Sequence, residues 1–358
     1  RMPKVLLHEH LDGGLRPETV FELASKCGYG QLPSRDPNEL AEWFRRGADR
    51  KSLPLYLEGF AHTIAVMQTP EALERVAFEA IEDCYHDGIV YTELRFAPVF
   101  HLQNGLSLEK VMEAVLTGMA RGRRKYNVEC GLIVCGMRHR EDSEEMAELA
   151  LDFRDRGCVG FDLAGEEAGH PPKRHLAGFD AIRRGNFYIT IHAGEAFGRE
   201  SIWQALQICG AHRVGHATRL IEDIVLHEGK VLKLGALSQF VLDRRIPLEI
   251  CLSSNVQTGA VPSLEEHPFG VYYREHFRVT LNTDNRLMSA TTLTKECQLA
   301  IEHYGLDFDD LEKIMINSMK SAFIPYDRRC AIIFGVIKPQ FKKLREELGL
   351  PPAKSRFG

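Results

Sequence analysis

The sequence contains no long apolar run, no paired cysteine motif and no excess of positive charge. No stretch approaches the ~18 apolar residues that a membrane-spanning helix requires, and no apolar leader opens the sequence, so we expect neither membrane insertion nor secretion. The 45 basic and 50 acidic side chains leave a formal net charge of -5, which offers no general attraction to a nucleic acid polymer. The composition is that of an ordinary globular protein, with 44% hydrophobic and 27% charged residues.

The nine cysteines are scattered, and no two of them form a Cys-x-x-Cys pair. Several lie in apolar runs, as Cys130 and Cys135 do. This distribution is typical of buried, reduced thiols, so we expect the protein to work in the reducing cytoplasm.

Two phosphate-binding motifs are also missing. No Gly-x-Gly-x-x-Gly follows the first apolar run, and no Gly-x-x-x-x-Gly-Lys-Ser/Thr occurs, which disfavours the nucleotide-phosphate folds. What the sequence does contain is an alternation of helical segments with short apolar runs, at 5–7, 89–96, 128–135, 159–163, 187–191, 213–214, 248–252 and 279–281. Such runs are typical of buried parallel strands, and helix starts such as Thr69-Pro70 and Ser107 lie between them.

This alternation predicts an α/β fold, a single (β/α)8 TIM-type barrel domain over residues 1–358. An open, doubly wound sheet fits the pattern alone equally well. Two regions depart from the alternation. Residues 12–68 are too long for one crossover and are expected to place extra helices over the C-terminal mouth of the barrel, while 306–358 should form a C-terminal helical appendage.

Histidines and carboxylates stand where the predicted strands end. His8 and His10 close the first run, and residues two apart on a strand face the same side, so both imidazoles can point to the barrel axis. Alone, the pair could equally be two satisfied polar residues. Three other strand ends add His192, His216 and Asp284, and the C-terminal rim of a barrel is where the chemistry of such enzymes lies. Histidine and carboxylate are ligands that zinc prefers.

Several further motifs occur in one order along nearly the whole chain. They are His8-Glu9-His10-Leu11-Asp12-Gly13, the segment from Leu53 to Phe60, Glu93-Leu94-Arg95, Asp162-Leu163-Ala164-Gly165-Glu166-Glu167, His192-Ala193-Gly194-Glu195, Gly215-His216 and Asn282-Thr283-Asp284. By these motifs the chain resembles the adenosine deaminases of the amidohydrolase superfamily. Adenine, aminofutalosine and AMP deaminases share part of the set.

The resemblance implies a catalytic site with one Zn2+ per chain. Its ligands would be His8, His10, His192 and Asp284. A single ion is expected because the predicted fourth strand has no lysine to carry a second one. Glu195 would give a proton to the purine ring, and His216 would orient the attacking hydroxide or take its proton. Asp284 would also aim the attack.

The resemblance further implies a purine nucleoside as the small-molecule partner. Its contacts would come from His10, Asp12, Gly165, Asn285, Met137 and an apolar helical stripe of Leu53, Tyr56, Leu57 and Phe60 acting as a lid. Asp12 favours adenosine and 2′-deoxyadenosine, because relatives that act on adenine or aminofutalosine typically carry Glu there. Asn285 departs from the family, which often has a second aspartate at this position.

Other functions remain open at this stage. Adenine or aminodeoxyfutalosine would be alternative substrates, and a barrel that only binds a partner would be a non-enzymatic alternative. AMP is disfavoured because no cluster of cations is available for its phosphate. The sequence predicts no oligomeric state.

Overall fold

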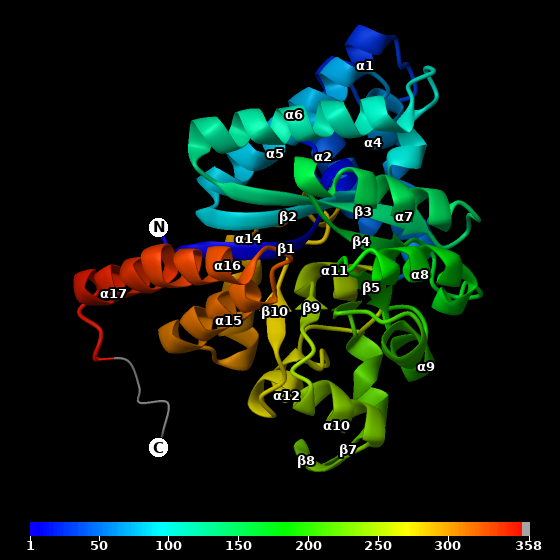
Figure 1. The fold of residues 1–358 in the computed structure, drawn as a ribbon. Coiled ribbons are helices and arrows are strands. Elements are labelled where there is room, and N and C mark those ends of the chain that lie inside the picture. Colours follow the sequence, from blue (N-terminus) through cyan, green and yellow to red (C-terminus); the bar gives the residue numbers. More distant parts are fainter. Residues whose placement is uncertain (353–358) are drawn as a thin grey trace.

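The computed structural model describes residues 1–352, and its framework is two four-stranded parallel sheets (Figure 1). The first has the order β1-β2-β3-β4, with β1 at Lys4–His10, β2 at Ile89–Phe96, β3 at Glu129–Met137 and β4 at Cys158–Ala164. The second has the order β10-β9-β6-β5, with β10 at Val279–Leu281, β9 at Leu248–Ile250, β6 at Arg213–His216 and β5 at Thr190–Ala193. The predicted α/β fold with parallel strands is thereby confirmed.

The two sheets meet at both of their edges. At one edge, a parallel bridge pairs Glu9 with Asp284, and the His10 N–H donates to the Asp284 carbonyl at 2.7 Å. At the other, a parallel bridge pairs Phe161 with Ile189, and the Phe161 N–H donates to the Tyr188 carbonyl at 2.9 Å. The carboxyl ends of all these parallel strands therefore lie on one side of the molecule.

Helices follow the strands, and most of them lie on the outside of the sheets (Figure 1). They are α5 (Pro70–His86), α6 (Leu108–Tyr126), α7 (Ser143–Asp152), α8 (Leu176–Arg184), α9 (Arg199–Trp203), α10 (Ala236–Asp243), α11 (Leu252–Gln257), α12 (Phe269–Arg274), α13 (Arg286–Ser289) and α14 (Leu293–Tyr304). The predicted helix starts are confirmed, because the Thr69 hydroxyl accepts from the Ala72 N–H and the Ser107 hydroxyl accepts from the Lys110 N–H.

Helices α1 (Pro17–Cys27), α2 (Pro37–Ala48), α3 (Leu53–Leu57) and α4 (Phe60–Val66) lie between β1 and β2. The residues from Leu53 to Phe60 do not form the single helix that was predicted, because the helix is interrupted between α3 and α4, although the four apolar side chains of the stripe still line one cavity. At the break the N–H groups of Glu58 and Ala61 bond carbonyls three residues back, which is a tighter turn than an α-helix makes. Gly59 lets the chain pack closely there, since a Cβ would lie 2.8 Å from the Met288 sulfur, which would have to shift.

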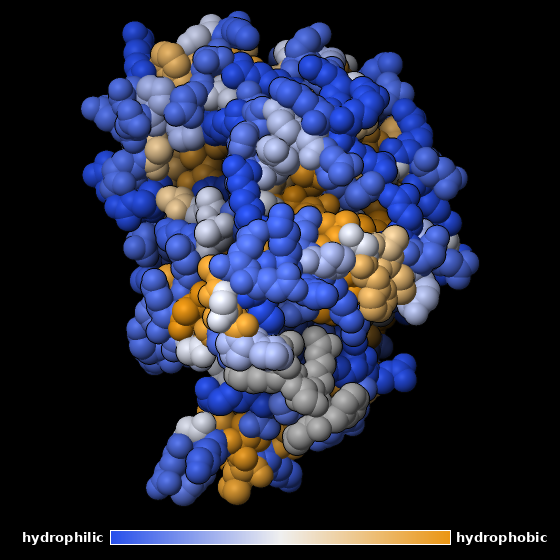
Figure 2. Space-filling model, turned by 90° about the vertical axis from the view of Figure 1, so that its left-hand side faces the viewer, coloured by the Kyte–Doolittle hydropathy of each residue, from blue (hydrophilic) through white to orange (hydrophobic). Residues whose placement is uncertain are grey.

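A hairpin that the sequence did not predict projects beyond α10. Its strands β7 (Ile224–His227) and β8 (Lys230–Leu234) are antiparallel. Three apolar side chains on it are solvent-exposed: Leu232 at 72%, Val225 at 50% and Leu226 at 41%. Figure 2 shows a largely hydrophilic face with apolar side chains visible in several places, one of which is the lobe at the bottom, where Figure 1 places this hairpin.

The C-terminal part begins with α15 (Phe308–Ser321), which packs against β1 and β10. Met315 is fully buried there, and its sulfur accepts from the Val5 N–H at 3.4 Å. Helices α16 (Tyr326–Ile332) and α17 (Lys338–Glu347), joined by a π-helical turn (η7, Ile333–Ile337), complete this part, and residues 353–358 of the predicted appendage lie outside the described residues. None of the helices in 1–352 is long and apolar enough to cross a membrane.

Candidate active site

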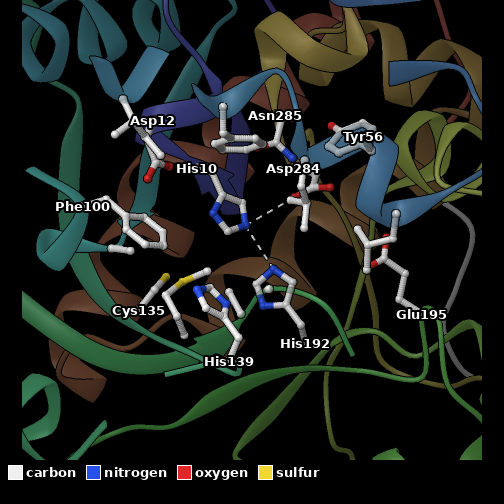
Figure 3. A pocket seen from close by; sticks show the side chains of 18 of the residues that line it. His10, Asp12, Tyr56, Phe100, Cys135, His139, His192, Glu195, Asp284 and Asn285 are labelled. Carbon is white, nitrogen blue, oxygen red and sulfur yellow. Dashed lines mark hydrogen bonds and ion pairs between the residues drawn. The ribbon is translucent and has the colours of Figure 1, made fainter. Parts of the chain in front are cut away.

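A cavity of about 240 Å³ opens where the carboxyl ends of the strands meet (Figure 3). The structure brings nearly every predicted site residue to its wall: His10, Asp12, Leu53, Tyr56, Leu57, Phe60, Met137, Gly165, His192, Glu195, His216, Asp284 and Asn285. The exception is His8, which lies fully buried against the same cluster. The residues come from segments that are far apart in the sequence, so the fold itself assembles the site.

Imidazole nitrogens and one carboxylate converge at the base of this cavity. His10 Nε2 lies 3.0 Å from His192 Nε2 and 3.4 Å from Asp284 Oδ1, the two contacts drawn as dashed lines in Figure 3. His8 Nε2 lies 3.2 Å from the same Asp284 oxygen. The Ser254 hydroxyl donates to the other Asp284 oxygen at 2.5 Å and fixes that carboxylate.

Two buried carboxylates hold the outer nitrogens of these rings. His8 Nδ1 lies 2.8 Å from Glu249 Oε2, and His192 Nδ1 lies 3.0 Å from Asp162 Oδ2. A carboxylate can only accept, so each ring in its neutral form carries its proton on Nδ1 and turns a bare Nε2 toward the cluster. In that form His8 Nε2 and Asp284 Oδ1 are two acceptors 3.2 Å apart, which is an arrangement that a bound cation would stabilise.

Buried charges inside the sheets support these carboxylates. Glu249 accepts from Arg95 Nη2 at 3.0 Å, from Arg213 Nε at 2.6 Å and from the Thr190 hydroxyl at 2.9 Å. Arg95 also donates to Asp162 at 3.0 Å, so one guanidinium links both backing carboxylates. The sequence analysis gave Glu249 no role, although a charged residue within an apolar strand could have identified it.

Two site residues have a left-handed backbone. His216 has φ +65° and Asp284 has φ +60°, a region that side chains other than glycine seldom adopt. His216 ends β6 and Asp284 follows the end of β10 at Leu281, and at each the backbone turns so that the side chain lines the cavity. Such conformations cluster at functional sites because the surrounding fold must hold them.

Glu195 lies beside this cluster on the loop after β5. The Glu167 carboxylate fixes that loop by accepting from the backbone N–H groups of residues 194–197 at 2.7–3.0 Å. The Thr258 hydroxyl donates to Glu195 Oε1 at 3.1 Å, and His216 Nε2 lies 3.6 Å from Oε2. Burial, with added repulsion from Asp284 and Glu167, raises the pKa of Glu195 well above its usual range, which favours the protonated acid over the carboxylate.

Two sets of four ligands fit a metal at this place. His8, His192, His216 and Asp284 each offer an atom, and these atoms lie within 4.8 Å of one another. The predicted set replaces His216 by His10, whose Nε2 makes the shorter contacts given above. The distances between these atoms do not distinguish the set with His10 from the set with His216.

The outer part of the cavity has polar and apolar walls. The Asp12 carboxyl is buried, which raises its pKa to about 7, and among residues 1–352 its Oδ1 has no hydrogen-bonding partner. Gly165 has φ +98°, and a Cβ there would lie 3.1 Å from the Met137 methyl group. Lining residues that the sequence analysis missed are mainly apolar: Ala61, Ile64, Ala97, Phe100, Cys135 and Ala164.

The lid residues and Asn285 occupy the opposite wall. Tyr56 donates to or accepts from the Ser289 hydroxyl at 2.8 Å, which ties α3 to α13. Asn285 Oδ1 is buried against the backbone of Gly13, where a Cβ would lie 2.0 Å from it. Within the described chain, no lysine or arginine side chain lines the cavity.

Comparisons with known proteins agree with this geometry. The family model described as adenosine deaminase matches residues 3–339. Adenosine deaminase 1 of Streptomyces coelicolor is 54% identical over 352 residues, covering 97% of this chain and 89% of the relative. Among solved structures, adenine deaminase from Arthrobacter aurescens has a TM-score of 0.83 at 23% identity, covering 96% of this chain and 100% of that one.

A second solved structure adds a metal to the comparison. An amidohydrolase from Burkholderia ambifaria, solved with bound Zn, has a TM-score of 0.83 at 21% identity. The match covers 97% of this chain and 93% of the Burkholderia chain. At this identity it shows the fold alone. The family model and the Streptomyces relative span nearly the whole sequence, so this chain belongs to the adenosine deaminase family.

Proposed function

We propose that this protein is a zinc-dependent hydrolase that converts adenosine and 2′-deoxyadenosine, with water, to inosine or 2′-deoxyinosine and ammonia. The observation that carries the proposal is the position of Glu195, buried where its protonated form is favoured, in the same cavity as the convergent imidazoles and Asp284. Hydrolytic deamination needs both an activated water and a proton donor for the purine ring.

The metal would be held by His8, His10, His192 and Asp284. The donor set fits one zinc ion, because three neutral imidazoles and a carboxylate are typical zinc ligands and leave room for water. When bound, zinc would lower the pKa of a water molecule from ~15.7 toward ~7. Glu249 and Asp162 support this assignment, since each would keep a ligand imidazole in the correct tautomer.

The remaining steps fall to side chains of this chain. Glu195 would donate its proton to purine N1 as water adds to C6, which relieves the charge that builds up on the ring. His216 and Asp284 would orient the attacking oxygen, and ammonia would leave from C6. The Glu167 carboxylate would hold Glu195 in place through the loop after β5.

Asp12 and His10 would bind the sugar hydroxyls, and the Gly165 N–H would approach N3 of the base. Asn285 would donate its amide to N7, which the family's usual aspartate does only when protonated. The lid residues Leu53, Tyr56, Leu57 and Phe60 would exclude water from the sugar side, and Met137 would pack on the base. A 5′-phosphate would lie near the buried Asp12 carboxyl, and the described cavity wall has no lysine or arginine side chain to bind it. This supports a nucleoside rather than a nucleotide as the substrate.

We further propose that the two sheets close into one (β/α)8 barrel, with α1 to α4 over its mouth, and that the whole chain is one catalytic domain. Bridges at both sheet edges support closure. The helices after α15 would then be an appendage on the outside. The nine cysteines, all free, favour a reducing compartment such as the cytoplasm.

Steady-state kinetics on the zinc-reconstituted protein test this proposal. We expect adenosine and 2′-deoxyadenosine to have kcat/KM values at least about 100-fold above those of adenine, aminodeoxyfutalosine and AMP, since a polar site rejects analogues that leave its buried groups unpaired. Absence of activity on adenosine would overturn the proposal. A preference for adenine would favour the alternative suggested by the Arthrobacter enzyme's name.

A further inference from the structure

His216 differs from the other imidazoles of the cluster in what its outer nitrogen faces. The outer nitrogens of His8 and His192 face carboxylates, which accept hydrogen bonds. His216 Nδ1 instead lies 2.9 Å from the side-chain amide nitrogen of Asn255, which donates them. The two kinds of partner impose opposite tautomers.

The orientation of the Asn255 amide is fixed by His267 and, through it, by the backbone. The Phe269 N–H donates to His267 Nδ1 at 3.0 Å. A backbone N–H can only donate, so His267 Nδ1 is a bare acceptor. Burial lowers the pKa of His267 to about 3, so the ring is neutral and its one proton is on Nε2.

The neutral His267 ring in turn fixes the orientation of the Asn255 side-chain amide. His267 Nε2 lies 3.1 Å from Asn255 Oδ1 and donates to it, so the amide oxygen faces His267 and the amide nitrogen faces His216. Asn255 is fully buried on α11, where its own N–H donates to the Cys251 carbonyl at 2.9 Å and its carbonyl accepts from the Val261 N–H at 3.1 Å. The side chain therefore has one way to satisfy both neighbours.

We infer that His267 and Asn255 are positioning residues that hold His216 in its Nε2–H tautomer, so that His216 donates a hydrogen bond to the reacting centre and is neither a metal ligand nor a base in its neutral form. The Nε2–H points toward Glu195 Oε2, 3.6 Å away. A protonated Nε2 has no free lone pair for a metal, so His216 is not a ligand. His10 is then the fourth zinc ligand beside His8, His192 and Asp284.

The inference also distinguishes two roles for His216. A neutral imidazole with hydrogen on Nε2 cannot remove a proton through that nitrogen, whereas it can donate to the attacking oxygen and orient it. The catalytic part of this inference rests on the proposed function. The tautomer itself rests on the contacts that link His216, Asn255, His267 and the Phe269 N–H, and on the neutral state of His267.

Imidazole 15N NMR on the zinc-loaded, full-length protein tests the tautomer directly. Two-bond correlations distinguish protonated from bare ring nitrogens, and His216→Gln identifies the His216 signals by their loss. We expect hydrogen on Nε2 of His216 and on Nδ1 of His8 and His192. Hydrogen on Nδ1 of His216, or zinc coordination through its Nε2, would overturn the inference. An expected tautomer in a protein that leaves adenosine unchanged would contradict the proposed function alone.

Variants of Asn255 and His267 test the effect of the His216 tautomer on catalysis. Asn255→Asp replaces the donor by an acceptor, so the His216 proton should move to Nδ1, and kcat should fall on the order of 100-fold, as when one donor to a reacting oxygen is lost, while KM changes little. His267→Phe frees the Asn255 amide and should give a mixture of tautomers and an intermediate kcat. His267→Gln keeps an N–H donor near Asn255 and should restore most of the activity.

A matched control is His212→Phe. His212 Nδ1 accepts from the Ile189 N–H at 3.0 Å, as His267 accepts from Phe269, but it lies at the amino end of β6 and has no contact with the cavity. We expect its kcat and its His216 spectrum to match the unmodified protein. If Asn255→Asp kept the Nε2–H tautomer and full kcat, the inference would fail, and the spectrum of the unmodified protein decides the matter even if that variant does not fold.

Discussion

Replacing Glu249 by glutamine should weaken both the fold and the metal site. The carboxylate accepts hydrogen bonds from His8, Arg95, Arg213 and Thr190, all of them buried. A glutamine keeps the shape but removes the negative charge that compensates two buried guanidinium groups. Removing one partner of a buried ion pair costs about 3–5 kcal/mol, and we expect the lower end because the amide oxygen still accepts.

The same change reaches the metal through His8. The His8 Nδ1–H would lose a carboxylate acceptor, and loss of such an outer partner weakens metal binding by about 10–100-fold. Urea unfolding at neutral pH measures the first effect, and competition with a chromophoric zinc chelator measures the second. Glu42→Gln is a suitable control, since Glu42 pairs with Arg45 on an exposed face of α2. Unchanged stability together with unchanged zinc affinity in Glu249→Gln would refute this reasoning.

Three further changes give distinct outcomes. Glu195→Gln mimics the shape of the protonated acid but cannot deliver a proton, so kcat for adenosine should fall about 100–10,000-fold while KM stays within a few-fold; full activity would exclude Glu195 as the proton donor. Asp12→Asn should flatten the pH dependence of stability. Burial raises the Asp12 pKa from 3.8 to about 7, so the folded protein holds a proton that the unfolded chain releases. Because of this group, the free energy of unfolding of the wild-type protein should fall by up to about 4 kcal/mol between pH 4 and pH 7. Equal slopes for the two proteins in urea unfolding at several pH values would contradict that assignment. Tyr56→Phe removes the bond to Ser289, which should cost about 1 kcal/mol in thermal unfolding and raise KM more than it lowers kcat; an unchanged KM would show that this bond does not anchor the lid.

The sequence predicted the strand-end residues well, because order along the chain is enough to place them. Parallel strands end on one side, so His10, His192 and Asp284 had to meet once the strands were identified. Apolar runs also located the strands to within a few residues. The main error in the lid was its continuity: the spacing of Leu53 to Phe60 fits one helix, whereas the structure has a tighter turn between α3 and α4, at the place where Gly59 packs closely against Met288.

The residues that hold the site histidines in place could not be found from the order of strands along the chain. Glu249 joins His8 across 241 positions, and Asn255 joins His216 across 39, so each contact depends on how strands and loops pack. The β7–β8 hairpin was missed for a different reason. Its strands include the apolar residues Ile224, Val225 and Leu226, but they pair antiparallel with each other outside the two parallel sheets, so the alternation of strands with helices does not predict them.

The central claim is a zinc-dependent release of ammonia from adenosine. The most direct measurement strips the protein with a chelator, returns zinc in steps and records ammonia and inosine formed from adenosine at each step. We expect no activity in the stripped protein and a rate that rises linearly until one zinc per chain is bound, with one ammonia for each inosine. A rate that is independent of zinc, or a zinc-loaded protein that forms no inosine, would contradict it.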